Sequence, residues 1–135
     1  MPTPRIPPEQ WTDQRHVDGH DAEQLVGEWF IARGWRVVAH RFRLGRHDLD
    51  LIVRQGSLVA FVEVKSRRSL RCGAGEEAVV AAKRATIERV AWAWLVRHGR
   101  VGDQYRFDVV SVRFAMNGQS AVRHIPDAWR PGWSR

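Results

Sequence analysis

The stretch that most constrains the fold of this chain is residues 48–65, DLDLIVRQGSLVAFVEVK. Two apolar runs flank a short polar segment, which predicts two antiparallel strands joined by a tight turn. Both strands carry charge where a core strand should have none, Asp48 and Asp50 in the first and Glu63 and Lys65 in the second. Burying carboxylates is costly unless they are paired or hold a metal ion. The hairpin therefore predicts a functional site as well as a fold.

Side-chain alternation along the two strands predicts which charges meet. A two-residue turn at Gln55 and Gly56 keeps the acids of both strands on one face. It places Asp48 opposite Glu63 and makes Asp50 the diagonal neighbour of Glu63, about 7 Å or less away between Cβ atoms. A bulge would change this register. Two carboxylates at that spacing are expected to converge on one divalent ion.

A hard divalent cation, Mg²⁺ or Mn²⁺, suits this pair of carboxylates. Mg²⁺ is commonly held by one or two protein carboxylates together with waters and substrate phosphates. The predicted metal ligands are therefore Asp50, Glu63 and the backbone carbonyl of Val64. Such an ion polarises a phosphoryl oxygen and lowers the pKa of a water molecule, and Lys65 would orient that water or offset charge developing on phosphorus. The alternative is that Asp50 and Lys65 form an ion pair that caps the edge of the sheet.

The charge of the chain indicates an anionic partner. Of 135 residues, 22 are Lys or Arg and 15 are Asp or Glu, so the formal net charge is +7. This suggests nucleic acid first and an anionic membrane second, with a merely basic surface as the alternative. No apolar run approaches the roughly 20 residues that span a bilayer, so we expect no membrane partner. The single cysteine, Cys72, excludes an internal disulfide and agrees with a cytoplasmic location.

The chain predicts one domain between two tails. Residues 1–16 hold four prolines in their first eight positions and are expected to form a flexible N-terminal tail. Residues 17–128 are long enough to build one α/β domain with its own core, and residues 129–135 are expected to be a C-terminal tail.

Helical and strand periodicities alternate within this domain. The expected elements are a helix from its N-cap Asp18 to Gly34, a strand over residues 35–42, the hairpin of residues 48–65, a second helix over 76–98, and strands over 105–114 and 121–125. The helical connection between the third and fourth strands requires a parallel crossover. The order therefore predicts an α/β fold in which helices flank a mixed sheet. On the first helix, Glu23 lies at the edge of the apolar stripe and either reaches the sheet or faces water.

Several motifs occur together in a characteristic order. They are Glu23 before the apolar first helix, the acidic run DLDLI, FVEVKSR at 61–67, AVVAAKR at 78–84 and RFDVV at 106–110. An Asp followed by Glu-x-Lys on the next strand resembles the PD-(D/E)xK nuclease superfamily. The ordered set, over about residues 18–128, resembles the YraN family of bacterial proteins. The resemblance implies a restriction-endonuclease-like, three-layer fold with an αβββαβ core, similar to Holliday-junction resolvases.

By this resemblance, Glu23, Asp50, Glu63 and Lys65 occupy the catalytic positions, with Glu23 completing the acidic cluster from the first helix. Lys83 matches a family lysine on the second helix and is either a phosphate contact or an exposed, structural lysine. The family's Gly-Glu-Ile-Asp segment is HDLD here. That segment keeps both acidic positions, but it has the shorter Asp48 where the family has glutamate and lacks the family's glycine.

Basic residues near these acids are expected to line a phosphate-binding groove, because phosphate neutralisation supplies most non-specific affinity for nucleic acid. They are Arg41, Arg43, Arg46, Arg67 and Arg68, together with Lys83. Asp108, in the strand over 105–114, either supports the acidic cluster or is structural, and the structural role is favoured.

The expected function is Mg²⁺-dependent hydrolysis of phosphodiester bonds in DNA, branched or junction DNA included. Cleavage of a junction would favour a homodimer by symmetry. The first alternative is a non-catalytic nucleic-acid-binding module with a nuclease fold, and the second is a purely structural or interaction protein. The residues leave open DNA against RNA, and exonuclease against endonuclease action.

Overall fold

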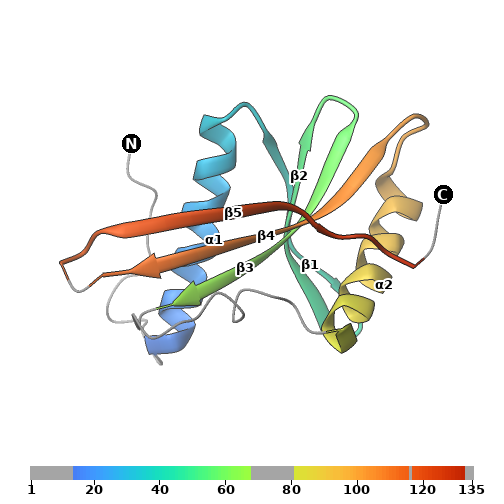
Figure 1. The fold of residues 1–135 in the computed structure, drawn as a ribbon. Coiled ribbons are helices and arrows are strands. Elements are labelled where there is room, and N and C mark those ends of the chain that lie inside the picture. Colours follow the sequence, from blue (N-terminus) through green and yellow to red (C-terminus); the bar gives the residue numbers. More distant parts are fainter. Residues whose placement is uncertain (1–13, 68–80, 116, 133–135) are drawn as a thin grey trace.

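A mixed sheet with two helices forms the protein. The computed structural model describes the backbone of residues 14–67, 81–115 and 117–132, and the side chains of these residues except 14–20 and 67. The elements are α1 (Gln14–Ala32), β1 (Arg36–Leu44), β2 (His47–Gln55), β3 (Leu58–Arg67), α2 (Ala81–His98), β4 (Gln104–Phe114) and β5 (Ser120–Trp129) (Figure 1). The strands follow one another in the sheet in chain order, and all neighbours are antiparallel except β3 and β4. The predicted αβββαβ core, with its parallel crossover, is confirmed.

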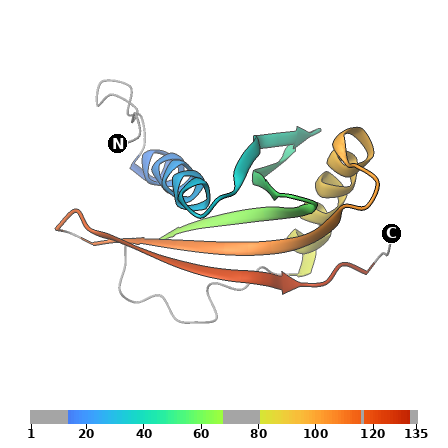
Figure 2. The same ribbon diagram turned by 90° about the horizontal axis from the view of Figure 1, so that it is seen from above.

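Two apolar clusters separate the molecule into three layers. The cluster beneath α1 contains Ala22, Val26 and Phe30 with the strand residues Leu51, Val53, Ala60, Val62, Val110 and Val112. The cluster beneath α2 contains Ile87, Val90, Ala91, Trp94 and Leu95 with Leu49, Ile52, Val59, Phe61, Phe107, Val109 and Trp129. Successive strand residues alternate between the clusters, as a sheet with helices on both faces requires. Seen from above, the β1–β2 hairpin lies between the two helices (Figure 2).

The turn between β2 and β3 lies one residue later than predicted. The ladder closes at Gln55, so Gly56 and Ser57 form the two-residue turn. Gly56 has a φ of 60°, and a type II′ turn places glycine at this first central position because glycine adopts positive φ without a Cβ penalty. The register therefore shifts by two residues, and the predicted pairing of Asp48 with Glu63 is wrong. Because side chains alternate with a period of two, the β3 residues keep the predicted face.

Two elements extend beyond their predicted limits. α1 begins at Gln14, so Asp18 lies inside the helix and is not its N-cap. β5 continues to Trp129, whose ring stacks on Phe107 with centroids 5.0 Å apart and whose Nε1 donates to Glu88 Oε2 at 3.0 Å. The predicted start of the second helix lies outside the described residues. Neither helix in the described part of the chain has the length and apolar character needed to cross a membrane.

Candidate functional site

A kink in the β1–β2 hairpin positions the first acid of the site. Leu49 and Ile52 pack beneath α2 whereas Leu51 packs beneath α1, so side-chain alternation is interrupted at Asp50. On the neighbouring strand Arg41 has a φ of 53°, in the left-handed region. Arg41 and Asp50 are missing from the ladder pairs that run from Ala39 with Ile52 to Leu44 with His47. A left-handed non-glycine residue costs about 1–3 kcal/mol and tends to occur where function requires it.

Acids from three elements meet in one pocket of about 600 Å³. The pocket lies where β2 and β3 separate, beyond their last ladder pair, Leu51 with Val62. Its lining includes Glu23 from α1, Asp50 from β2, Glu63 and Val64 from β3, and Lys83 from α2. Both helices and the strands β2 and β3 therefore contribute to the pocket. The structure thus brings together residues that the sequence predicted would converge.

The Asp50 carboxylate occupies the place of a strand partner for β3. Its Oδ2 accepts a hydrogen bond from the Val64 backbone N–H at 2.8 Å. Burial, and to a smaller extent the Glu63 carboxylate, raise the pKa of Asp50 to about 8, although the Val64 N–H favours the charged form. The surroundings of Asp50 thus provide too little positive charge for two ionised acids.

Glu63 is buried beside the ammonium group of Lys83 at the pocket. Its side chain is 4% exposed, and its Oε2 lies 3.2 Å from Nζ of Lys83, whose side chain is 57% exposed. Burial raises the pKa of Glu63, while Lys83 and, more weakly, Lys65 lower it. The net direction is upward. Lys83 therefore offsets only part of the cost of burying Glu63.

Glu23 reaches the sheet, one of the two placements left open by its position on the helix. Its carboxylate accepts hydrogen bonds from Arg41 Nε at 2.9 Å and Nη2 at 3.3 Å, and lies 2.7 Å from His40 Nε2. His40 and Arg41 are consecutive in β1 and would face opposite sides of a regular strand. The left-handed conformation of Arg41 brings both to the same carboxylate.

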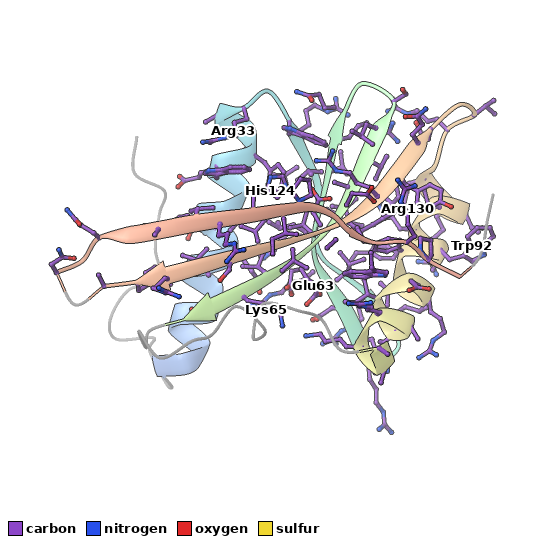
Figure 3. All side chains as sticks on the ribbon, viewed as in Figure 1. Arg33, Glu63, Lys65, Trp92, His124 and Arg130 are labelled. Atoms are coloured by element: carbon purple, nitrogen blue, oxygen red, sulfur yellow. The ribbon has the colours of Figure 1, made fainter. Side chains whose placement is uncertain are left out.

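The remaining predicted site residues lie at differing distances from the pocket. Lys65 is half-buried on the same face of β3 as Glu63 (Figure 3), but it does not line the pocket. Arg46 lines the pocket from the β1–β2 turn. Arg43 is exposed on β1, where it pairs in the ladder with Asp48. The structure gives only the backbone of Arg67, and Arg68 lies outside the described residues.

Sequence reasoning missed His40 and the partners of Asp108. The signal for His40 was its place in the basic end of the first strand, but contact with Glu23 depends on the conformation of its neighbour. Asp108 is fully buried on β4 and contacts Arg106 Nε at 2.9 Å, His124 Nε2 at 2.8 Å and the Asp127 N–H at 3.0 Å. Phe30, on α1, also contacts the His124 ring. Asp108 therefore has the structural role that the sequence favoured.

The donor set fits a hard divalent cation. Asp50 and Glu63 contribute carboxylates and Val64 a backbone carbonyl, and Mg²⁺ uses one or two carboxylates with waters and phosphate oxygens as its other ligands. In the described ranges, no three His, Cys, Asp or Glu side chains are grouped to hold an ion. A metal here would therefore depend on two protein carboxylates, and Glu23 is engaged by its basic neighbours.

Comparisons with known proteins identify the family. Among solved structures, the chain is similar to SfsA of Pyrococcus furiosus in complex with Ca²⁺, with a TM-score of 0.38 and 13% identity over 81% of this chain and 62% of that chain. A UPF0102 protein of Anaeromyxobacter dehalogenans is 37% identical over 89% of this chain and 92% of its own length. A relative in Symbiobacterium thermophilum is 39% identical over 82% and 94%. The model of the "uncharacterised protein family UPF0102" matches residues 22–112. The chain therefore belongs to family UPF0102, the YraN family that its motifs predict.

Proposed function

We propose that this protein is a divalent-metal-dependent nuclease that hydrolyses phosphodiester bonds in DNA. The observation that carries the proposal is the convergence of two poorly compensated acids, Asp50 and Glu63, in a pocket that also contains Lys83. Desolvated acids that cations compensate only in part destabilise a fold. Their presence in a pocket where β2 and β3 separate is explained when a cation and a phosphate together complete the site.

The residues of the pocket have separate roles in this reaction. Asp50 and Glu63, with the carbonyl of Val64, would hold the ion, which supplies positive charge for the phosphoryl oxygens and lowers the pKa of water. The Val64 N–H fixes the orientation of the Asp50 carboxylate. Hydrolysis adds water across one P–O bond, and it leaves a phosphate monoester and a hydroxyl group.

Basic residues around the acids would bind the phosphate. The half-exposed Lys83 ammonium lies beside Glu63 and is within the pocket, so it can contact a phosphate oxygen as well as the carboxylate. Lys65, on the same face of β3, is expected to offset negative charge that develops on phosphorus. Glu23 is assigned an auxiliary role, because Arg41 and His40 already engage its carboxylate.

Metal-dependent cleavage tests the proposal. The purified protein is incubated with single-stranded, duplex and branched DNA in Mg²⁺, Mn²⁺ or EDTA, and products are resolved on denaturing gels. We expect cleavage in either metal and none in EDTA. Glu63→Gln, which removes a ligand but keeps the side-chain volume, should lower the rate by more than about 100-fold, since even outer-sphere changes cost 10–100-fold.

Glu28→Gln is the matched control, because Glu28 is an exposed acid on α1 outside the pocket. It should cleave as the natural protein does. Cleavage that survives Glu63→Gln would refute the assignment of the site. Binding of DNA without cleavage in either metal, unchanged by Asp50→Asn, would instead favour a non-catalytic nucleic-acid-binding module. That outcome has one structural observation in its favour, the engagement of Glu23 by Arg41.

A further inference from the structure

The face of the sheet beneath α2 changes character along β3, β4 and β5. Residues of these strands form rows in register, and the row Phe61, Phe107 and Trp129 is aromatic and packs beneath α2. One step along, Glu63 lies beside Val109. In Figure 1, α2 lies near one end of these strands, and the turn between β4 and β5 is at the other. The helix, over its described residues Ala81–His98, thus covers only part of this face.

The next positions on the same face are basic and polar. Lys65 on β3 pairs with Ser111 on β4, and Ser111 pairs with Arg123 on β5. Arg113 follows Ser111 by two residues and therefore shares its face. Strands are about 4.8 Å apart, so the row from Lys65 to Arg123 spans about 10 Å between Cα atoms. We name Lys65, Ser111, Arg113 and Arg123 the β4–β5 basic face.

Residues of the β4–β5 basic face are partly buried and surround a hollow. Ser111 is 5% exposed, Arg113 is half-buried and Arg123 is exposed. Together with Ala121 and Val122 they line a hollow of about 210 Å³. Half-burying an arginine fixes its guanidinium more firmly than full exposure does, and a fixed guanidinium loses less conformational freedom on binding.

The chemistry of this face fits a phosphodiester backbone. Guanidinium groups bind phosphate oxygens in bidentate geometry, and a serine hydroxyl donates one further hydrogen bond. The four members of the face include three cations and no acid or aromatic ring. Without a ring for base stacking, such a surface contacts the charged backbone and has no preference among bases.

We propose that the β4–β5 basic face binds the backbone of one nucleic-acid strand as it leaves the pocket. Lys65 links the two sites, because it is two residues from Glu63 on β3 and pairs with Ser111 on β4. The strand would then extend from the pocket toward the turn between β4 and β5, which lies at the opposite end of these strands from α2 (Figure 2). This inference rests on the proposed function, since it takes the pocket as the place where the strand is cut.

Salt-dependent binding of a labelled oligonucleotide tests the inference. Fluorescence anisotropy in EDTA compares the natural protein with R113Q/R123Q, which removes two charges from the face. Each phosphate contact contributes about 0.7 to the slope of log K against log salt for single strands. We expect R113Q/R123Q to reduce the magnitude of this negative slope by about 1.4 and to weaken binding about tenfold at low salt.

Two further variants separate a local effect from net charge and from misfolding. R89Q/R130Q removes two exposed arginines elsewhere, one on α2 and one beyond β5, and should bind almost as the natural protein does. R113K/R123K keeps the charges and should retain most of the salt slope. The inference is wrong if R113Q/R123Q keeps the natural slope, or if R89Q/R130Q loses as much as R113Q/R123Q.

The outcomes also separate this inference from the proposed function. Loss of binding in R113Q/R123Q, with no cleavage by the natural protein in any metal, would support the β4–β5 basic face as a binding surface and refute the proposed nuclease activity. Cleavage by the natural protein, with an unchanged salt slope in R113Q/R123Q, would support the proposed nuclease activity and show that the nucleic-acid strand binds another surface. Thermal unfolding of each variant confirms that the measured proteins are folded.

Discussion

Two half-buried acids of this protein, Asp103 and Asp50, have opposite surroundings. The Asp103 side chain is 2% exposed and receives both Nη groups of Arg54 at 2.8 Å, together with the Arg100 N–H at 2.7 Å. These contacts lower its pKa to about 2, chiefly through the Arg54 hydrogen bonds. The pKa of Asp50 is instead raised to about 8 by burial and by Glu63. One acid is fully compensated within the fold and the other is not.

The difference separates acids that stabilise the fold from the acids that the proposed function assigns to a metal ion. Asp108 belongs with Asp103, because it is fully buried and has Arg106, His124 and a backbone N–H as partners. The sequence of this chain is rich in arginine, so a guanidinium partner for Asp50 would have been easy to provide. The hydrogen bond that the structure shows to the Asp50 carboxylate comes instead from the Val64 backbone N–H, which carries no net charge.

The largest expected effect comes from breaking the compensated pair. Arg54→Met leaves the Asp103 carboxylate buried without its main partner, and loss of one partner of a buried ion pair costs about 3–5 kcal/mol. We expect the free energy of unfolding in urea to fall by about 3 kcal/mol or more. The double variant Arg54→Met/Asp103→Leu should recover much of this loss, because it leaves no unpaired charge. A fall of less than about 1 kcal/mol in the single variant would place this pair among weak surface pairs.

A smaller effect on the free energy of unfolding is expected when the pH is lowered. The pKa of Asp103 in the folded protein, about 2, lies below its ordinary value of 3.8, so the folded state favours the charged form. The stabilisation is therefore complete above about pH 4 and is lost as the pH falls toward 2. The natural protein should exceed Asp103→Asn in unfolding free energy at neutral pH, and the difference should shrink in that window. Other acids titrate in both proteins and cancel. A difference independent of pH would contradict the assignment.

The same contrast explains what could be predicted from sequence. The element order and the mixed sheet follow from periodicity and from the length of the helical connection. The charges in an apolar hairpin predict that Asp50 and Glu63 meet, although the structure corrects the register from which their spacing was predicted. The pairing of Arg54 with Asp103 joins residues 49 positions apart, and no local pattern marks it. The left-handed conformation of Arg41 was equally hidden, since the contacts with Glu23 that accompany it exist only in the folded protein.

The smallest expected effect on stability comes from Asp50→Asn. The amide keeps the side-chain volume and is uncharged, like the protonated acid that a pKa of about 8 favours at neutral pH, so in EDTA the free energy of unfolding should change by less than about 1 kcal/mol. The response of the unfolding temperature to divalent ions should then distinguish the natural protein from Asp50→Asn. An ion that binds only the folded state stabilises it by RT ln(1 + [L]/Kd), so Mg²⁺ should raise the unfolding temperature of the natural protein and leave that of Asp50→Asn unchanged.

Asp48→Asn provides the control for that measurement, because Asp48 is an exposed acid at the rim of the same pocket. If Asp48→Asn keeps the Mg²⁺ response, the ion depends on the buried pair and the exposed acid is dispensable. If Asp48→Asn loses the response as well, the site needs the third acid that the family motif contains. A response of equal size in the natural protein and in Asp50→Asn would mean that the ion binds elsewhere. The raised pKa of Asp50 would then reflect an uncompensated acid with no metal to explain it, and the contrast with Asp103 would lose its functional meaning.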